Sequence, residues 1–141
     1  MQQALREVLT LTALARTVLA RRLDLSVHDV EAMEQVMLAA EPLGPVELSR
    51  RLGVTSAAAT QSVHRLQAAG HVVRTPHPVD RRRQVLRVTP SGASHVLSHL
   101  GPLLALSARA CEGLSEDERA AVQRFLAGIA HAYREFIAGP G

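Results

Sequence analysis

The sequence contains no lysine and no tryptophan, and its two phenylalanines and one tyrosine all lie near the C-terminus. Proteins that bind RNA or single-stranded DNA stack the bases on aromatic side chains. Because no aromatic residue lies in the basic middle of the chain, this mode of binding is disfavoured. Cys111 is the only cysteine, which excludes an intrachain disulfide and is typical of a protein in a reducing cytoplasm.

A long apolar run is also missing. Arg6, Glu7 and Arg16 interrupt the apolar N-terminus, so we expect neither a signal peptide nor a membrane span, and we predict a cytoplasmic protein with no membrane partner. The motifs of common active sites are absent as well: there is no glycine-rich phosphate loop, no Gly-x-Ser-x-Gly and no His-Glu-x-x-His. We therefore predict a protein that is not an enzyme and has no cofactor.

The positive charge is concentrated in the middle of the chain. Residues 50–90 hold eight of the 16 basic residues and one acid, Asp80, whereas the rest of the chain is acidic overall. A basic centre between acidic flanks is typical of a surface that binds duplex DNA. The length of 141 residues and the apolar fraction of 47% predict a single folded domain.

Residues 45–70 have the pattern of a helix-turn-helix. Pro45 at the first helical position and Gly53 just past the end bound a short helix with Val46, Leu48 and Leu52 on its apolar side. Thr55 is a good N-cap for a second helix over residues 56–69, which Gly70 ends. Two short helices joined by a turn that contains a glycine form this motif.

The second of these helices has the two faces that a recognition helix needs. Ala59, Val63 and Leu66 are spaced to pack inward. On the other face, small residues allow close approach to the major groove, and glutamine or arginine can reach base edges. An ordinary solvated helix face would show the same pattern. The residues expected to face DNA are Thr55, Ser56, Ala57, Thr60, Gln61, His64 and Arg65.

A hairpin is predicted to follow this motif. Residues 71–74 and 84–88 are short and rich in valine, which predicts two strands. The loop between them ends in three adjacent arginines, which suit a narrow minor groove and its phosphates. We expect Asp80 to pair with one of these arginines and Arg74 to shape the hairpin. The wing residues expected to contact DNA or to shape the loop are Arg74, Asp80, Arg81, Arg82 and Arg83.

Helices are predicted before the helix-turn-helix. Residues 2–22 are apolar around most of the helix, which predicts burial on more than one side. Ser26-x-x-Asp29 is a variant of the capping box and should open a helix that ends near residue 40. The side chains of this helix expected to face inward are Val30, Met33 and Met37.

Two more helices are predicted after the hairpin. Thr89 should cap a helix from residue 90 to about residue 111, with a kink at Gly101-Pro102. Ser115-x-x-Glu118 is a capping box that should start the last helix. The apolar stripe of the first of these helices is Leu97, Leu100, Leu104 and Cys111. The stripe of the last helix is Val122, Phe125, Leu126, Ile129, Tyr133, Phe136 and Ile137.

The whole chain resembles the MarR family of bacterial transcriptional regulators. The most specific part is Asp80-Arg81-Arg82 followed at a fixed distance by Thr89-Pro90-Ser91-Gly92. Ala57-Ala58-Ala59 and Gln61 depart from the bulkier or basic residues that are common in the family. The other residues that carry the match are Glu47-Leu48, Leu52-Gly53-Val54, Thr60 through Leu66, Gly70 and Arg74.

The resemblance implies a mostly α fold (α+β, winged helix-turn-helix) with a small two-stranded wing. It places a DNA-binding lobe at residues 27–90 and a helical dimerisation region at residues 1–25 and 90–141 of one domain, 1–141. It implies a homodimer that binds a palindromic operator in double-stranded DNA, most often as a repressor. It also implies a pocket for a small-molecule effector between the dimer interface and the lobe.

Three alternatives come from individual residues. His95 and His99 lie one helical turn apart and could share a metal ion, and Cys111 could act as a thiol switch. Solvent-facing histidines and a cysteine in the core are the ordinary interpretations. His28 could lie near the pocket, or in an exposed first turn. A winged helix that binds protein in place of DNA is a further alternative, against which the excess of arginine argues.

Overall fold

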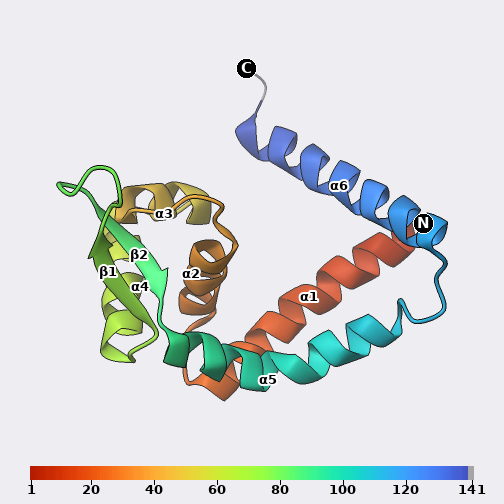
Figure 1. Ribbon diagram of the computed structural model, residues 1–141, viewed down its shortest axis with the longest axis horizontal. Coiled ribbons are helices and arrows are strands. Elements are labelled where there is room, and N and C mark those ends of the chain that lie inside the picture. Colours follow the sequence, from red (N-terminus) through yellow and green to blue (C-terminus); the bar gives the residue numbers. More distant parts are fainter. Residues whose placement is uncertain (140–141) are drawn as a thin grey trace. The chain divides into compact units, whose positions relative to one another are not determined.

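The computed structural model describes residues 1–139, which form six helices and one two-stranded sheet (Figure 1). The chain divides into two compact units, Met1–Gly101 and Pro102–Gly141. The mostly helical architecture with a small sheet confirms the predicted fold class. The elements are α1 (Gln2–Leu23), α2 (Val27–Leu38), α3 (Pro45–Leu52), α4 (Ser56–Ala68), β1 (Val72–Pro76), β2 (Gln84–Val88), α5 (Pro90–Arg109) and α6 (Glu116–Ala138).

The predicted caps start and end these helices. The Thr55 side chain accepts a hydrogen bond from the backbone N–H of Ala58, and Gly53 ends α3 in the left-handed conformation at φ 65°. Ser115 and Glu118 form a complete capping box at the start of α6. The Ser26 side chain accepts from the backbone N–H of Asp29. Only this half of the predicted box forms, because the Asp29 carboxylate binds elsewhere, as described below.

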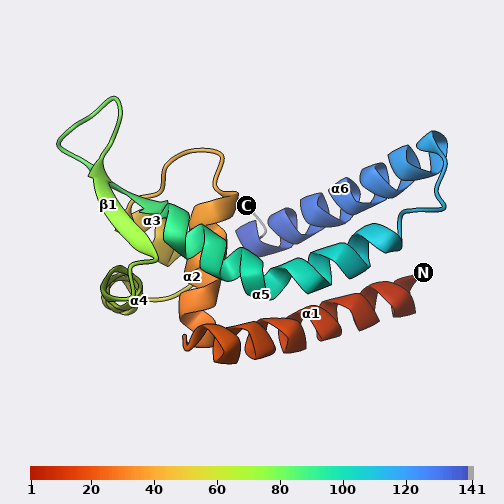
Figure 2. The ribbon, with the colours of Figure 1, turned by 60° about the horizontal axis from the view of Figure 1, so that its bottom comes forward.

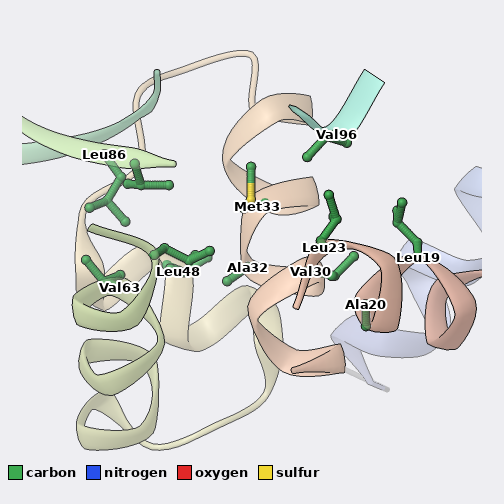
Figure 3. Close-up of a cluster of buried hydrophobic side chains, with 12 residues drawn as sticks. Leu19, Ala20, Leu23, Val30, Ala32, Met33, Leu48, Val63, Leu86 and Val96 are labelled. Carbon is green, nitrogen blue, oxygen red and sulfur yellow. The ribbon is translucent and has the colours of Figure 1, made fainter. Parts of the chain in front are cut away.

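The core of the first unit surrounds α2. Figure 3 shows Leu48, Val63 and Leu86 gathered on one side of this helix, and residues of α1 and α5 on the other. Among the predicted core residues of α2, Val30 and Met33 are buried, but Met37 is exposed. The buried cluster consists of Leu19, Ala20, Leu23, Val30, Ala32, Met33, Leu48, Val63, Leu66, Val72, Leu86 and Val96.

The buried face of α5 differs from the predicted stripe. Val96 is buried, whereas Leu97 and Leu104 are exposed. The physical reason is Gly92, whose lack of a side chain lets α5 approach His71 closely. Val96 lies four residues after Gly92, on the same side of the helix. Val46, predicted on the apolar side of α3, is exposed as well.

We expect Gly92→Ala to destabilise the fold. A Cβ atom at this position would lie 2.5 Å from the His71 carbonyl oxygen and 2.7 Å from its Cα atom. Because backbone must shift to relieve this overlap, the free energy of unfolding should fall by about 1–3 kcal/mol. Gly128→Ala is the matched control, since nothing lies within 4 Å of its added Cβ. Urea unfolding of both variants tests the prediction, and equal stability would contradict it.

The hairpin forms the predicted wing, with β1 longer at its C-terminal end than predicted. The strands are antiparallel and pair from Val72 opposite Val88 to Pro76 opposite Gln84, so Thr75 and Pro76 belong to β1. His71 lies outside the strand. Figure 2 shows the loop between the strands extending away from the helices of the first unit. The wing tip is therefore free to contact another molecule.

Two helices leave their apolar faces uncovered. In α1 only Leu19, Ala20 and Leu23 are buried, so burial on more than one side is not achieved within one chain. No residue of α6 in the described part of the chain is buried. Within residues 1–139, no helix is long and apolar enough to cross a membrane. The large exposed side chains of the two helices are Val8, Leu9, Leu11, Leu14, Val18, Val122, Phe125, Leu126, Tyr133, Phe136 and Ile137.

Candidate nucleic-acid interface

Helix α4 presents the predicted face to solvent. Ala59, Val63 and Leu66 pack into the core, which confirms their inward orientation. The side chains of the outer face are short at the N-terminal end of the helix, and those further along carry hydrogen-bonding groups. Of the residues predicted to face DNA, Thr55, Ser56, Ala57, Gln61, His64 and Arg65 are exposed and Thr60 is half-buried. An exposed helix of this shape can enter a major groove.

Arg65 is bound within the protein. Its Nε donates to Oδ2 of Asp29 at 2.9 Å, and its Nη2 donates to Oδ1 at 2.7 Å. The same Nη2 donates to the Ser62 hydroxyl at 3.0 Å. Asp29 is only 2% exposed, so this carboxylate needs a cation beside it. The sequence contained a signal for this buried acid. Asp29 lies four residues before inward-facing Met33, so helical periodicity places its carboxylate on the buried face of α2.

The wing loop is shaped by different contacts from those predicted. Asp80 pairs with no arginine side chain in residues 1–139; its Oδ1 accepts from the backbone N–H of Arg82 at 3.1 Å. The Nδ1 atom of His77 accepts from the backbone N–H groups of Val79 and Asp80 at 3.2 Å and 3.1 Å. His77 was not predicted to have this role. A histidine just before a turn can cap backbone donors, which is the signal that could have identified it.

The three wing arginines are not equivalent. Arg83 Nη2 donates to Glu47 Oε1 at 2.8 Å, which joins the end of the loop to α3. The Glu47 carboxylate accepts a hydrogen bond from the backbone N–H of the same residue, and this bond holds the pKa of Glu47 below its usual value. The charge of Arg83 lowers this pKa too. Arg81 and Arg82 are exposed and form no ion pair within the described residues. These two arginines carry the free charge of the tip.

Arg74, which was predicted to shape the hairpin, lies in the middle of β1 opposite Leu86. It is half-buried, and its Nε and Nη2 atoms have no hydrogen-bond partner in the described part of the chain. Its charge therefore adds to the positive potential of the wing without a carboxylate to neutralise it.

An apolar cavity of ≈ 330 Å³ lies in the first unit, at the junction of α1, α2 and α5. This volume is at the lower end of the range for ligand pockets. Glu34 is the only charged residue that lines it, and the Glu34 carboxylate pairs with Arg16 Nη2 at 3.0 Å. The lining residues are Leu19, Leu23, Val30, Met33, Glu34, Met37, Leu38, Val96 and Leu100.

Comparisons with known proteins found similar sequences. Residues 36–83 match the model of the MarR family. The chain is 28% identical over 133 residues to the uncharacterized HTH-type transcriptional regulator YcgE of Bacillus subtilis, covering 94% of this chain and 86% of that protein. It is 34% identical over 86 residues to the multiple antibiotic resistance protein MarR of Salmonella typhimurium, covering 60% of each. These matches support the assignment of the chain to the MarR family.

Solved structures of MarR-family proteins share the fold. A mutant of MepR from a multidrug resistant S. aureus clinical isolate has a TM-score of 0.75 at 14% identity, covering 94% of this chain and 97% of that one. Regulator Tm0710 from Thermotoga maritima has a TM-score of 0.66 at 22% identity, covering 99% and 97%. MarR-family proteins are transcriptional regulators and not enzymes, which confirms the prediction made from the missing catalytic motifs.

Of the residues considered for sensing, Cys111 is not in the core as expected, whereas His28 lies in an exposed first turn. Cys111 is exposed in a turn, because α5 ends at Arg109 and not at residue 111, so it does not belong to an apolar stripe. His28 is exposed, and its Nδ1 atom lies 3.2 Å from Glu31 Oε2. It does not line the apolar cavity.

Three imidazole rings cluster where α5 meets the start of β1. The ring centroids of His71 and His95 are 5.1 Å apart, and those of His95 and His99 are 5.3 Å apart. Within residues 1–139, no group of three or more histidine, cysteine or acidic side chains is arranged to hold a metal ion. The arrangement of His95 and His99 therefore does not support the metal-sensing alternative.

The stability of the protein should depend on the protonation of His71. Burial lowers the pKa of His71, and the neighbouring His95 lowers it further. The unfolded chain, with a histidine pKa of about 6.5, then binds the proton more readily than the folded protein. The contribution of His71 to stability is fully present above the unfolded-state pKa of about 6.5, and it is lost as the pH falls through the lower pKa of the folded state. His71→Gln should flatten the pH dependence of urea unfolding, and an unchanged dependence would contradict this.

Proposed function

We propose that this protein is a homodimeric cytoplasmic repressor that binds a palindromic operator in duplex DNA. The observation that carries the proposal is the pair of free arginines, Arg81 and Arg82, on a projecting wing beside an exposed recognition helix. The wing enters the minor groove and contacts phosphates while α4 lies in the major groove. The residues of α4 and its N-cap that touch DNA are Thr55, Ser56, Ala57, Thr60, Gln61 and His64.

The dimer is supported by the uncovered apolar faces of α1 and α6. Contiguous exposed apolar side chains mark interaction surfaces, and a second copy of the chain offers the same patches in return. In this proposal residues 1–25 and 90–141 form the dimerisation region, and residues 27–90 form the DNA-binding lobe. A two-fold symmetric dimer presents two copies of α4 to the two halves of a palindrome.

The apolar cavity is the proposed effector site. Its lining offers contacts to apolar groups, and the one charged side chain, Glu34, is an acid. A small apolar ligand fits this lining best, because the one charged side chain is already paired with Arg16 and the other lining residues are apolar. Among solved relatives, the structure of CouR from Rhodococcus jostii RHA1 was determined bound to p-coumaroyl-CoA; it has a TM-score of 0.62 at 22% identity, covering 90% of this chain and 89% of that one.

Binding to the DNA just upstream of the protein's own gene, compared with a random duplex over a series of salt concentrations, tests the proposal. If each protomer neutralises three or four phosphates, log K should fall with log salt with a slope on the order of −6. Tighter binding to the upstream DNA would establish a local operator. No binding to either duplex at low salt would overturn the proposal in favour of a winged helix that binds protein.

A further inference from the structure

The recognition helix has one charged residue, and that charge is neutralised inside the protein. Arg65 is the only charged side chain in the sequence of α4. It contributes two hydrogen bonds to Asp29, one to each carboxylate oxygen, in the bidentate arrangement that makes the strongest pairs of this kind. The third contact, to Ser62, lies within α4 itself. The guanidinium is therefore held in one orientation by both helices.

Asp29 lies on the central helix of the first unit. It is the third residue of α2, next to Val30 and one turn before Met33, both of which are in the core. The pair thus joins α4 to the helix around which the core is built, across 36 residues of sequence. Burial alone would raise the pKa of Asp29, but hydrogen bonds from Arg65 and Ser62 and the guanidinium charge outweigh it, so this pKa is lowered. Both partners remain charged at neutral pH, and their charges cancel.

We propose that Arg65 is a positioning residue. Its ion pair with Asp29 keeps the Arg65 guanidinium from contacting DNA and sets the orientation of the recognition helix. This inference rests on the proposed DNA-binding function. It also changes the role that the sequence predicted for Arg65. Arg65 is exposed but Asp29 is buried, so DNA binding that exchanged Asp29 for a phosphate would leave a buried carboxylate without a cation.

In this proposal the uncharged side chains of α4 contact the base edges. Arginine is the side chain that most commonly reads guanine, through its O6 and N7 atoms. With Arg65 held by Asp29, the exposed reading groups that remain on the helix include Ala57 in its first turn and Gln61 at its centre. Glutamine pairs with adenine N6 and N7, and an alanine methyl group contacts the methyl group of thymine. The helix should therefore prefer A·T pairs at the positions that these two residues contact.

The test compares Arg65→Gln with Arg82→Gln, which is the same substitution at an unpaired wing arginine. Both are measured on the tightest duplex that the wild-type protein selects from random sequences. Arg82→Gln should reduce the magnitude of the salt slope by about 1.8, which is about 0.9 for each protomer of the dimer. Arg65→Gln should leave the slope unchanged while weakening binding to the selected duplex about tenfold or more, because a displaced α4 loses base contacts.

The outcomes separate this inference from the proposed function. A salt slope reduced by Arg65→Gln as much as by Arg82→Gln would show that Arg65 contacts phosphate, and would overturn the inference alone. The inference would also be overturned if the wild-type protein selected guanine at base pairs that α4 contacts and the Arg65→Gln variant lost this preference. If the wild-type protein selects no duplex, the proposed function fails and the inference falls with it. Should Arg65→Gln not fold, the double variant Asp29→Asn/Arg65→Gln, with no buried charge left unpaired, takes its place.

Discussion

Replacing both Arg81 and Arg82 by alanine is expected to weaken DNA binding by about a hundredfold or more at moderate salt. Of the three arginines at the wing tip, these two have no carboxylate partner among the described residues, whereas Arg83 is paired with Glu47. A dimer loses up to four phosphate contacts in this variant, and each contact contributes about 0.9 to the salt slope. The slope should therefore become shallower by up to about 3.6.

A matched control removes the same charge elsewhere. Arg109 and Arg124 are exposed arginines outside the DNA-binding lobe, so Arg109→Ala/Arg124→Ala should keep the wild-type slope and nearly the wild-type affinity. Fluorescence anisotropy with a labelled duplex over a series of salt concentrations measures both quantities. If the wing variant kept the wild-type slope, the assignment of the wing to DNA would be wrong.

The second large effect is expected from Leu126→Glu in α6. Leu126 lies on the apolar face of α6, which no other residue in the described part of its own chain buries. A carboxylate in the proposed dimer interface would have to be desolvated without a partner, so the variant should be monomeric. A monomer loses the gain from binding two half-sites together, which is worth about a hundredfold to ten-thousandfold in affinity.

Ala127→Glu provides the control for this substitution. It introduces the same charge at the neighbouring residue, which helical periodicity turns away from the apolar face. Size-exclusion chromatography with light scattering gives the oligomeric state, and anisotropy gives the affinity for DNA. A dimeric Leu126→Glu protein would contradict the use of α6 as an interface. A dissociated Ala127→Glu protein would show that any charge on α6 has this effect.

Local patterns in the sequence were sufficient to predict the helices, their caps and the hairpin. Thr55, Gly53 and Ser115 act on backbone groups within a few residues, so their roles can be recognised without a tertiary structure. The contacts that the sequence did not predict join side chains that are far apart in the chain. Arg65 and Arg83 were both predicted to contact DNA, and each binds an acid 36 residues earlier in the chain. Periodicity does not identify such partners.

The apolar stripes show a related difficulty. Helical spacing identifies a face but not its exact centre, so Leu97 was predicted in the core where Val96 lies, because the close approach at Gly92 sets the rotation of α5. For α6, the spacing correctly identified an apolar face, but a single chain does not cover it. Both cases depend on what lies opposite the helix, which the sequence of the helix does not contain.

The Asp29–Arg65 pair also bears on how DNA specificity could be transferred between relatives. One route would exchange the recognition helix as an independent cassette. Here the cassette carries an arginine whose counter-ion belongs to another helix, 36 residues earlier. A chimera that received α4 alone would gain an unpaired guanidinium on its reading surface, and a chimera that lost α4 would bury an acid without its cation. The transferable unit is therefore α4 together with the N-terminal turn of α2.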